Sequence, residues 1–341
     1  MPSAMIDAYQ VYFDAVLAKT IARYEERVGQ RFDAPISIRC ADHQDFWAYA
    51  FMGHKELRLE IASGALDRIR EVWTKALTTS SRLPPNHQIE LLGHQDHAVE
   101  TSFAWLLQHE LNHQAIGHFT IIPGAGLSEA QCPNGLGIVE LDTSQPSQLS
   151  ELTEQEKAEI HMCFELQTDH DATEIVLGAY VKENWPLFRY YAVCILAVLF
   201  IIEAEERRLS KPFRQHPFAS TRLFMLLGHL AELPMIPGIK RAQAEGLDHL
   251  PADYLPTSDE MFGYRQAVMS PVLAASQIFA AACGISEAWD ELGTAEAMFA
   301  DIDTILINQN RDVSAFRTQG ARQWAELQPT NDRLLRSLGW K

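Results

Sequence analysis

Apolar side chains recur at helical spacing along most of the chain, and two short segments near its beginning alternate instead. Residues 5–29 repeat apolar positions every three or four residues, which predicts a helix. The segments "APISIRC" (34–40) and "KELRLEIA" (55–62) predict short strands, because the second alternates apolar with charged positions as a half-exposed strand does. A small N-terminal sheet or hairpin is therefore expected beside the first helix.

Two long helices are predicted in the middle of the chain. Helical spacing returns at residues 96–119, and again at residues 153–181, where Thr153 and Glu156 are spaced as a capping box. The intervening segment, about residues 120–152, is rich in glycine and proline. This composition predicts a long connection, of the kind that forms a lid or a regulatory loop.

The longest apolar run, residues 190–202, predicts a buried helix, since its 13 residues fall short of the roughly 20 that span a bilayer. No stable membrane insertion is therefore expected. Residues 1–28 carry acidic positions early and no basic stretch followed by an apolar block, so no secretory signal is expected. The five cysteines are widely spaced and form no CxxC pair, which is typical of free thiols in a cytoplasmic protein.

The charge balance narrows the choice of partners. The formal net charge is −17, with 28 Lys and Arg against 45 Asp and Glu. Nucleic acids and anionic membranes require clustered basic side chains that displace counterions. We therefore expect no nucleic-acid partner, and the sequence does not indicate an oligomeric state.

The segment "WLLQHELNHQAIGHF" (105–119) carries two histidines that bracket a glutamate. His109 and His113 are four residues apart, so they share one face of a helix and can chelate one ion, as in zinc peptidases. Glu110 lies on the adjacent edge, where it can accept a proton from an activated water. The alternative is a pair of core or solvated histidines. His118 is rotated by about 140° from His113 on a straight helix, so it is not expected to reach the same ion.

An acidic pair on the following helix provides a candidate third ligand. Glu165 and Asp169 are also four residues apart and lie among apolar residues. One carboxylate can bind the metal while the other accepts the outer N–H of a ligand histidine. His161 and His170 flank this pair and are further candidates for ligands or substrate contacts. A solvated acidic face is the alternative.

A third pattern follows in "RQHPFASTRLF". His216 precedes a proline at the mouth of a predicted helix, and Arg222 follows six residues later. The histidine could donate to an oxyanion formed when water attacks a polarised carbonyl, and the arginine could orient that histidine or anchor substrate. A simple helix-entry histidine is the alternative.

The motifs "HELNHQAIGH", "ELQTD" and "HPFASTR" together resemble the gluzincin type of zinc metallopeptidase, in the group of the CaaX prenyl proteases and the heat-shock membrane endopeptidases. The order and internal spacing match over about residues 56–228, with Thr168 where the group has alanine. The segment "LRLEIASGALDRI" looks like the edge strand and helix that precede the catalytic helix of that group. The better-known members are membrane proteins, so this chain looks closer to soluble relatives with the same catalytic core.

The resemblance implies a role for each matched residue and one Zn²⁺ per chain. The implied zinc ligands are His109, His113 and Glu165, and the implied general base is Glu110. Asp169 would support one of the zinc ligands. His216 and Arg222 would form the pair on the oxyanion or substrate side. The implied function is a zinc-dependent endopeptidase that cleaves a protein or peptide substrate.

Two other functions compete with this interpretation. A non-catalytic metal-binding regulator or scaffold on a peptidase fold would be expected to lose Glu110 or a ligand, and the sequence retains them. A di-iron helical bundle could use the ExxH from Glu110 to His113, but it needs a second ExxH, which the helix with Glu165 lacks.

The expected fold is mainly α (α+β), with a helical zincin-like metallopeptidase core, a small N-terminal sheet or hairpin and extra C-terminal helices. Residues 1–95 are expected to form a helix and a small sheet packed on the core. Residues 96–235 carry the three motifs and form the catalytic helical core, and residues 236–341 form a C-terminal helical extension.

Overall fold

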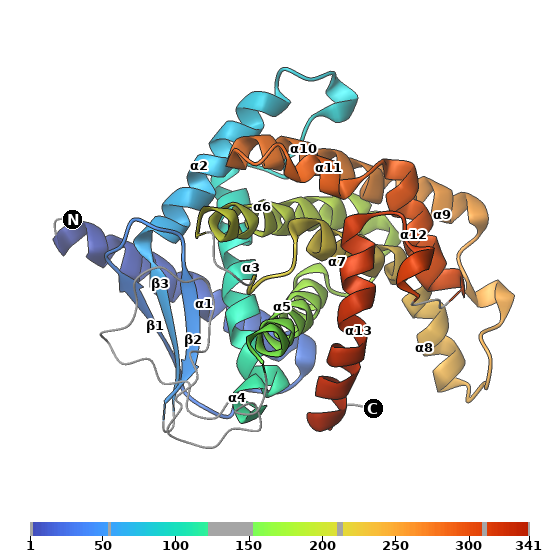
Figure 1. Ribbon diagram of the computed structural model, residues 1–341, viewed down its shortest axis with the longest axis horizontal. Coiled ribbons are helices and arrows are strands. Elements are labelled where there is room, and N and C mark those ends of the chain that lie inside the picture. The colour runs from blue at the N-terminus through green and yellow to red at the C-terminus, as the bar shows by residue number, and fades with distance from the viewer. Residues whose placement is uncertain (1–2, 54–55, 122–152, 210–213, 309–311, 340–341) are drawn as a thin grey trace.

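The computed structural model describes residues 3–53, 56–121, 153–209, 214–308 and 312–339. It is mainly helical with one small sheet, which confirms that the fold is mainly α with a small N-terminal sheet (Figure 1). The helices of eight residues or more are α1 (Ser3–Val28), α2 (Ser63–Ser80), α3 (Gln95–Ile116), α5 (Glu154–Leu177), α6 (Trp185–Leu209), α7 (Ala219–Glu232), α8 (Ile236–Ala244), α10 (Ser270–Cys283), α12 (Ala295–Asn308) and α13 (Gln319–Ser337). Shorter helices are α4 (His118–Ile121), α9 (Ser258–Tyr264) and α11 (Ala288–Leu292), and the strands are β1 (Ile36–Ala41), β2 (Ala48–Met52) and β3 (Leu57–Ala62).

The sheet has three strands in the order β1-β3-β2. β1 runs parallel to β3, and β2 runs antiparallel to β3 with Ala50 opposite Leu59. The expectation that "LRLEIA" forms an edge strand is therefore wrong, because this segment is the central strand β3. The strand β2 lies at one edge and contacts α3. Its sequence "AYAFM" lacks an alternation of apolar and polar residues, and for this reason it was not predicted.

Helix α3 is the central helix of the fold. Figure 1 shows it between the sheet and the other helices, and it contacts α1, α2, α5, α6 and β2. Every residue from Trp105 to His113 is buried, so this part of the helix is enclosed on all sides. Because buried polar groups are costly without partners, the polar residues of α3 must find them inside the protein.

One hydrophobic core joins the three segments that the sequence suggested. It extends from Phe13 in α1 to Ala325 in α13, and a smaller cluster packs α5 against α13. The predicted capping box of α5 is confirmed, because the Thr153 hydroxyl accepts from the Glu156 N–H and the Glu156 side chain accepts from the Thr153 N–H. The described cysteines, which are Cys40, Cys163, Cys194 and Cys283, are buried free thiols. Cys132 lies outside the described residues. Almost all of the predicted connection over 120–152 also lies outside them.

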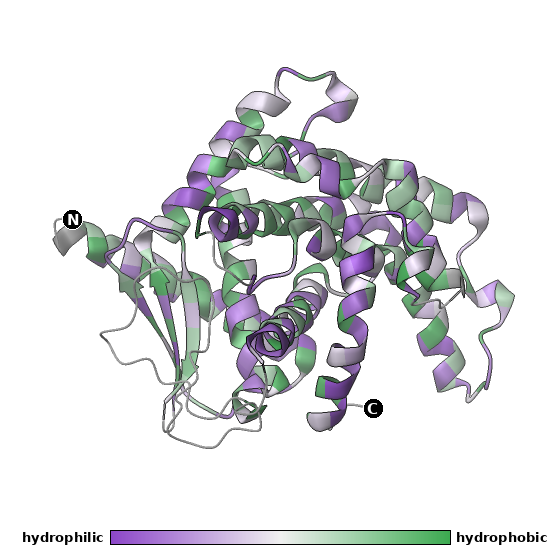
Figure 2. Cartoon of the chain, viewed as in Figure 1, coloured by the Kyte–Doolittle hydropathy of each residue, from purple (hydrophilic) through white to green (hydrophobic). Residues whose placement is uncertain are grey.

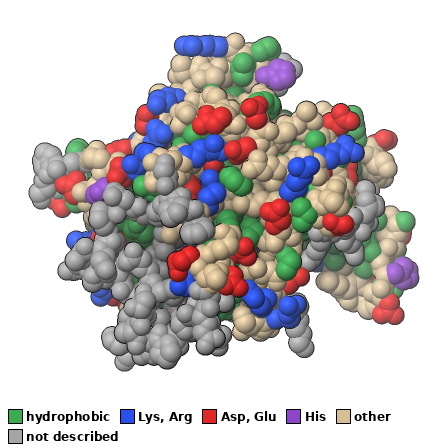
Figure 3. Space-filling model, in the orientation of Figure 1, with side chains coloured by type: hydrophobic (Ala, Val, Ile, Leu, Met, Phe, Trp, Pro, Cys, Tyr) green, Lys and Arg blue, Asp and Glu red, His purple; other side chains and the backbone are tan. Residues whose placement is uncertain are grey.

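Apolar residues concentrate in α6 and α10, as Figure 2 shows. Three helical stretches, Lys182–Leu209, Ala219–Ala244 and Ala252–Cys283, are long and apolar enough to cross a membrane by length and composition. The 13-residue apolar run at residues 190–202 is thus only part of a longer apolar helical stretch. Each stretch contains an 18-residue apolar segment, and within the fold 78%, 56% and 61% of these segments, in the same order, are buried. On the face in Figure 3, acidic and basic side chains are interspersed.

Candidate metal centre

The packing of α3 against α5 brings two imidazoles and one carboxylate together. Ligand atoms of His109, His113 and Glu165 all lie within 4.8 Å of one another. The four-residue spacing puts both histidines on the face of α3 that meets α5. The three residues expose only 3%, 6% and 4% of their surfaces, so this is an interior site.

Two separations within this group are close to those between ligands of one metal ion. Nε2 of His109 lies 3.1 Å from Oε2 of Glu165, and Nε2 of His113 lies 3.6 Å from Oε1. Ligands held about 2.0–2.2 Å from a tetrahedral zinc are roughly 3.3–3.5 Å apart. Two histidines and one carboxylate, with the fourth position left for water, form the ligand set of many catalytic zinc sites.

Asp169 supports His109 from one turn further along α5. Its Oδ1 lies 2.9 Å from Nδ1 of His109, which leaves Nε2 facing Glu165. The guanidinium of Arg222 in α7 donates two hydrogen bonds to the same carboxylate, at 2.5 and 2.6 Å. Burial raises the pKa of Asp169, but Arg222 and His109 hold it below its usual value. Arg222 therefore contacts Asp169, the residue that supports the candidate ligand His109.

His118 supports His113, although the straight-helix argument separated the two. Helix α3 ends at Ile116, and Gly117 adopts a left-handed conformation with φ of 92°. The turn brings Nδ1 of His118 to 3.0 Å from Nδ1 of His113. The assumption of a straight helix is therefore wrong, and His118 contacts the ring nitrogen of His113 that points away from Glu165. Burial lowers the pKa of His118 to about 4, so its imidazole is neutral at pH 7.

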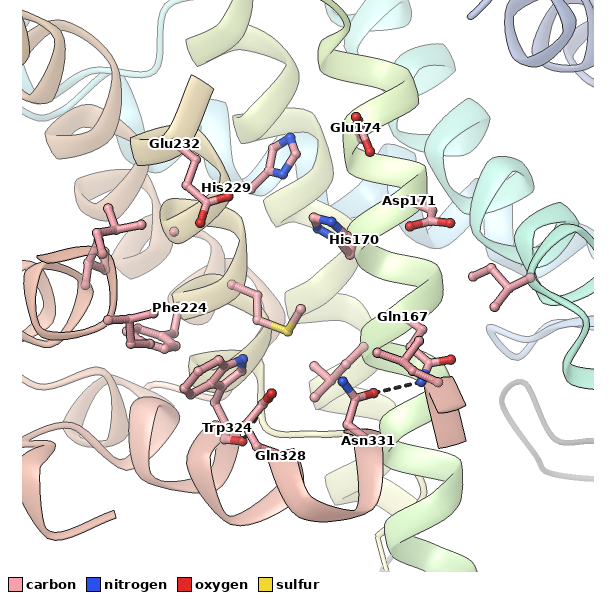
Figure 4. Close-up of a pocket in the computed structure, with 18 residues that line it drawn as sticks. Gln167, His170, Asp171, Glu174, Phe224, His229, Glu232, Trp324, Gln328 and Asn331 are labelled. Atoms are coloured by element: carbon pink, nitrogen blue, oxygen red, sulfur yellow. Dashed lines mark hydrogen bonds between the residues drawn. The ribbon is translucent and has the colours of Figure 1, made fainter. Parts of the chain in front are cut away.

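A hydrogen-bond chain continues from His118 to the last helix. Nε2 of His118 lies 2.8 Å from Oε1 of Gln167 in α5. The side-chain amide of Gln167 donates to Oδ1 of Asn331 in α13 at 2.7 Å, the dashed line in Figure 4. These residues were not predicted as part of the site, because the contact depends on the bend at Gly117.

Replacing His118 with leucine should weaken zinc binding about 10- to 100-fold, the usual effect of removing a group that orients a ligand histidine. The His113 ring would lose the contact that fixes its orientation and tautomer. Competition with a chromophoric chelator measures the affinity, and the exposed His249→Ala variant is the matched control. Equal zinc affinity in the His118→Leu variant and the control would contradict this role.

His216 faces the same carboxylate from the loop before α7. Its Nε2 lies 3.4 Å from Oε2 of Glu165, and its Nδ1 lies 3.1 Å from Oε2 of Glu206 in α6. Glu206 also accepts a hydrogen bond from the backbone N–H of Gln215 at 2.9 Å. Glu206 was not among the predicted site residues. A signal was present, because Glu203 and Glu206 follow the apolar run of α6 one turn apart and both are buried.

Glu110 lies beside the ligand group on α3 and is not a member of it. A di-iron centre would need this carboxylate as a ligand. The backbone N–H of Ala50 in β2 donates to Glu110, which connects the edge strand to the site. Burial and the charge of Glu165 raise the pKa of Glu110 to about 7. A carboxylate with this pKa can both accept and return a proton near neutral pH.

The carboxylates and imidazoles of the site shift one another's pKa values. Burial lowers the pKa of His109, but Glu165 and Asp169 outweigh it and raise the pKa to about 10. Burial also raises the pKa of Glu165, while His216, His109 and His113 lower it below its usual value. Without a metal, the charge of the Glu165 carboxylate is thus balanced by a proton on His109.

No family model matches this chain, and no curated protein or solved structure matches it. Of the predicted residues, His109, His113 and His216 converge on the Glu165 carboxylate, and Asp169 lies beside His109. The flanking candidates His161 and His170 are not in the ligand group, and His170 lines a separate cavity.

Proposed function

We propose that this chain is a zinc-dependent endopeptidase, similar in its site to the gluzincin group that its motifs resemble. The observation that carries the proposal is the convergence of Nε2 of His109, Nε2 of His113 and the Glu165 carboxylate. Each ligand histidine also has its other ring nitrogen beside a dedicated partner, Asp169 or His118. Such outer partners set the tautomer of a metal-binding histidine.

The remaining residues then have distinct chemical roles. Zinc held by these ligands would supply a Lewis acid that activates water and polarises the scissile carbonyl. Glu110 would accept the proton of the attacking water and deliver it to the leaving amine. His216, held by Glu206, would stabilise the developing oxyanion. Arg222 would keep Asp169 ionised and in place.

The substrate we propose is an extended peptide segment. The edge strand β2 lies next to Glu110 through the Ala50 N–H. An edge strand can pair its outward backbone groups with an extended chain, which gives affinity without a side-chain requirement. The four buried free cysteines support a cytoplasmic location, and the burial of most of α6 supports a helix that packs in the fold rather than in a membrane.

A second candidate is a non-catalytic metal-binding regulator, which the depth of the centre favours. Glu110 and His216 each expose 3% of their surface, as deep as the ligands. A peptide therefore reaches the centre only after neighbouring groups move, whereas a structural zinc site needs no such access. Retained peptide cleavage separates the two functions.

Zinc titration of the metal-free chain should show one ion per chain and the release of about one proton near pH 7.5. The proton leaves His109, whose pKa of about 10 keeps it charged below that pH and whose Nε2 must be deprotonated to bind metal. As the pH rises through 10, the part of the proton release that comes from His109 should disappear. Calorimetry in buffers of different ionisation enthalpy measures this release, and a chain that takes up no zinc contradicts the proposal.

A further inference from the structure

A cavity of about 470 Å³ lies between α5, α7, α12 and α13 (Figure 4). It is within the usual size range of small-molecule sites. The cavity and the ligand group use different residues of α5, since Glu165 belongs to the ligand group and His170, Asp171 and Glu174 line the cavity. Gln167 also lines the cavity and connects it to His118. The proposed peptidase assigns no role to this space.

The lining of the cavity combines apolar side chains with three carboxylates. Phe224, Trp324 and Ile305 are among the apolar lining residues. The acidic residues are Asp171, which is half-buried, and Glu174 and Glu232, which are exposed. None of the residues that line the cavity is a lysine or arginine, so the carboxylates have no basic side chain beside them in the lining.

His229 gives an independent indication of a polar ligand. It is 8% exposed, lines the cavity from α7 and points toward His170 (Figure 4). Within the described part of the chain, neither ring nitrogen has a hydrogen-bond partner. Burial lowers the pKa of His229 to about 3, so the ring is neutral and offers one donor and one acceptor. A buried polar group without a partner is costly, and a bound ligand would remove that cost.

We propose that this cavity binds a small amphipathic amine, with an apolar body of about 10–15 non-hydrogen atoms and one ammonium group. The apolar body lies against Phe224 and Trp324, where its surface leaves water. The ammonium lies beside Glu232 and donates a hydrogen bond to the acceptor nitrogen of His229, which is on the same helix (Figure 4). An anion is disfavoured by the carboxylates, and a neutral ligand gains no charge-assisted hydrogen bond.

Gly228 offers a way to close the cavity without disturbing its chemistry. It lines the cavity in the middle of α7, and a Cβ at this position would meet no atom within 4 Å. The Gly228→Leu variant therefore fills space with a side chain that the helix favours. The Gly228→Ala variant is the matched control, because it changes the backbone in the same way and adds a single methyl group.

The test is calorimetric titration of the full chain with phenylbutylamine, phenylbutanol and phenylbutyrate, which share the apolar body and differ in charge. We expect one phenylbutylamine to bind per chain. Phenylbutanol should bind at least about tenfold more weakly than the amine, and phenylbutyrate should not bind. Gly228→Leu should abolish binding, and Gly228→Ala should retain it. Glu232→Gln should weaken the amine selectively, while the exposed Glu296→Gln variant, away from the lining, should not.

Three results would overturn the proposal. If phenylbutylamine does not bind, the cavity is not an amine site. If phenylbutanol binds as tightly as the amine, the charge has no role in recognition. If Gly228→Leu binds the amine as wild type does while melting at the same temperature, the ligand binds elsewhere. Each measurement is independent of peptide cleavage, so failure of the peptidase proposal leaves this test unaffected.

Discussion

Replacing Glu110 with glutamine should reduce peptide cleavage about 10³-fold, within the 10²- to 10⁴-fold range of a lost general base. Glutamine has the same shape but cannot accept the proton of the attacking water. Glu110 is not in the ligand group, so zinc content should stay at one per chain. A cleavage assay on a peptide library, with zinc measured in the same samples, tests both parts.

The matched control is Glu165→Gln on the facing helix. It removes a carboxylate from the ligand group itself, so it should lose zinc and activity together. If zinc-loaded wild type cleaves no peptide, or if Glu110→Gln cleaves as well as wild type, the endopeptidase proposal fails. The non-catalytic metal-binding function would then account for the site.

The Arg222→Met variant should lower the free energy of unfolding by about 3–5 kcal/mol, as expected when one member of a buried ion pair is removed. The side chains of Arg222 and Asp169 are 1% and 8% exposed, so the remaining carboxylate cannot recover its hydration. Because the folded-state pKa of Asp169 is below its unfolded value, the pair stabilises at neutral pH. That contribution should disappear as the pH falls through the folded-state pKa. Urea unfolding of the metal-free chain measures the loss.

The double variant Arg222→Met with Asp169→Asn separates the ion pair from simple packing. It removes both charges of the pair and keeps an oxygen beside Nδ1 of His109, so it should recover most of the lost stability. A double variant as unstable as Arg222→Met alone would show that the loss comes from packing. In that case Asp169 would not be a charge that Arg222 must balance.

The sequence predicted the site well where spacing along a helix determines geometry. His109 and His113 share a face of α3 because they are four residues apart, and the same spacing aligns Glu165 with Asp169 on α5. Their approach across two helices could not be derived from spacing. It was expected because the acidic pair lies among apolar residues on the next helix and because the order of the motifs resembled a known group.

Contacts were missed where the chain changes direction. His118 is outside the ligand group, as expected, but the bend at Gly117 returns it to His113, which a straight-helix calculation cannot represent. The strand β2 has no alternating pattern, because it packs against α3 as well as lying in the sheet. The contact of Glu206 with His216 depends on how the loop before α7 folds back to α6. Each of these contacts is set by tertiary structure, which local periodicity does not encode.

The hydrogen bonds from His113 through His118 and Gln167 to Asn331 have a consequence for protein synthesis. A nascent chain that has emerged only as far as α7 already carries all the proposed zinc ligands and Glu110. It lacks Asn331, and its small cluster between α5 and α13 has not formed. The hydrogen bonds that orient His113 would therefore be complete only after α13 has left the ribosome.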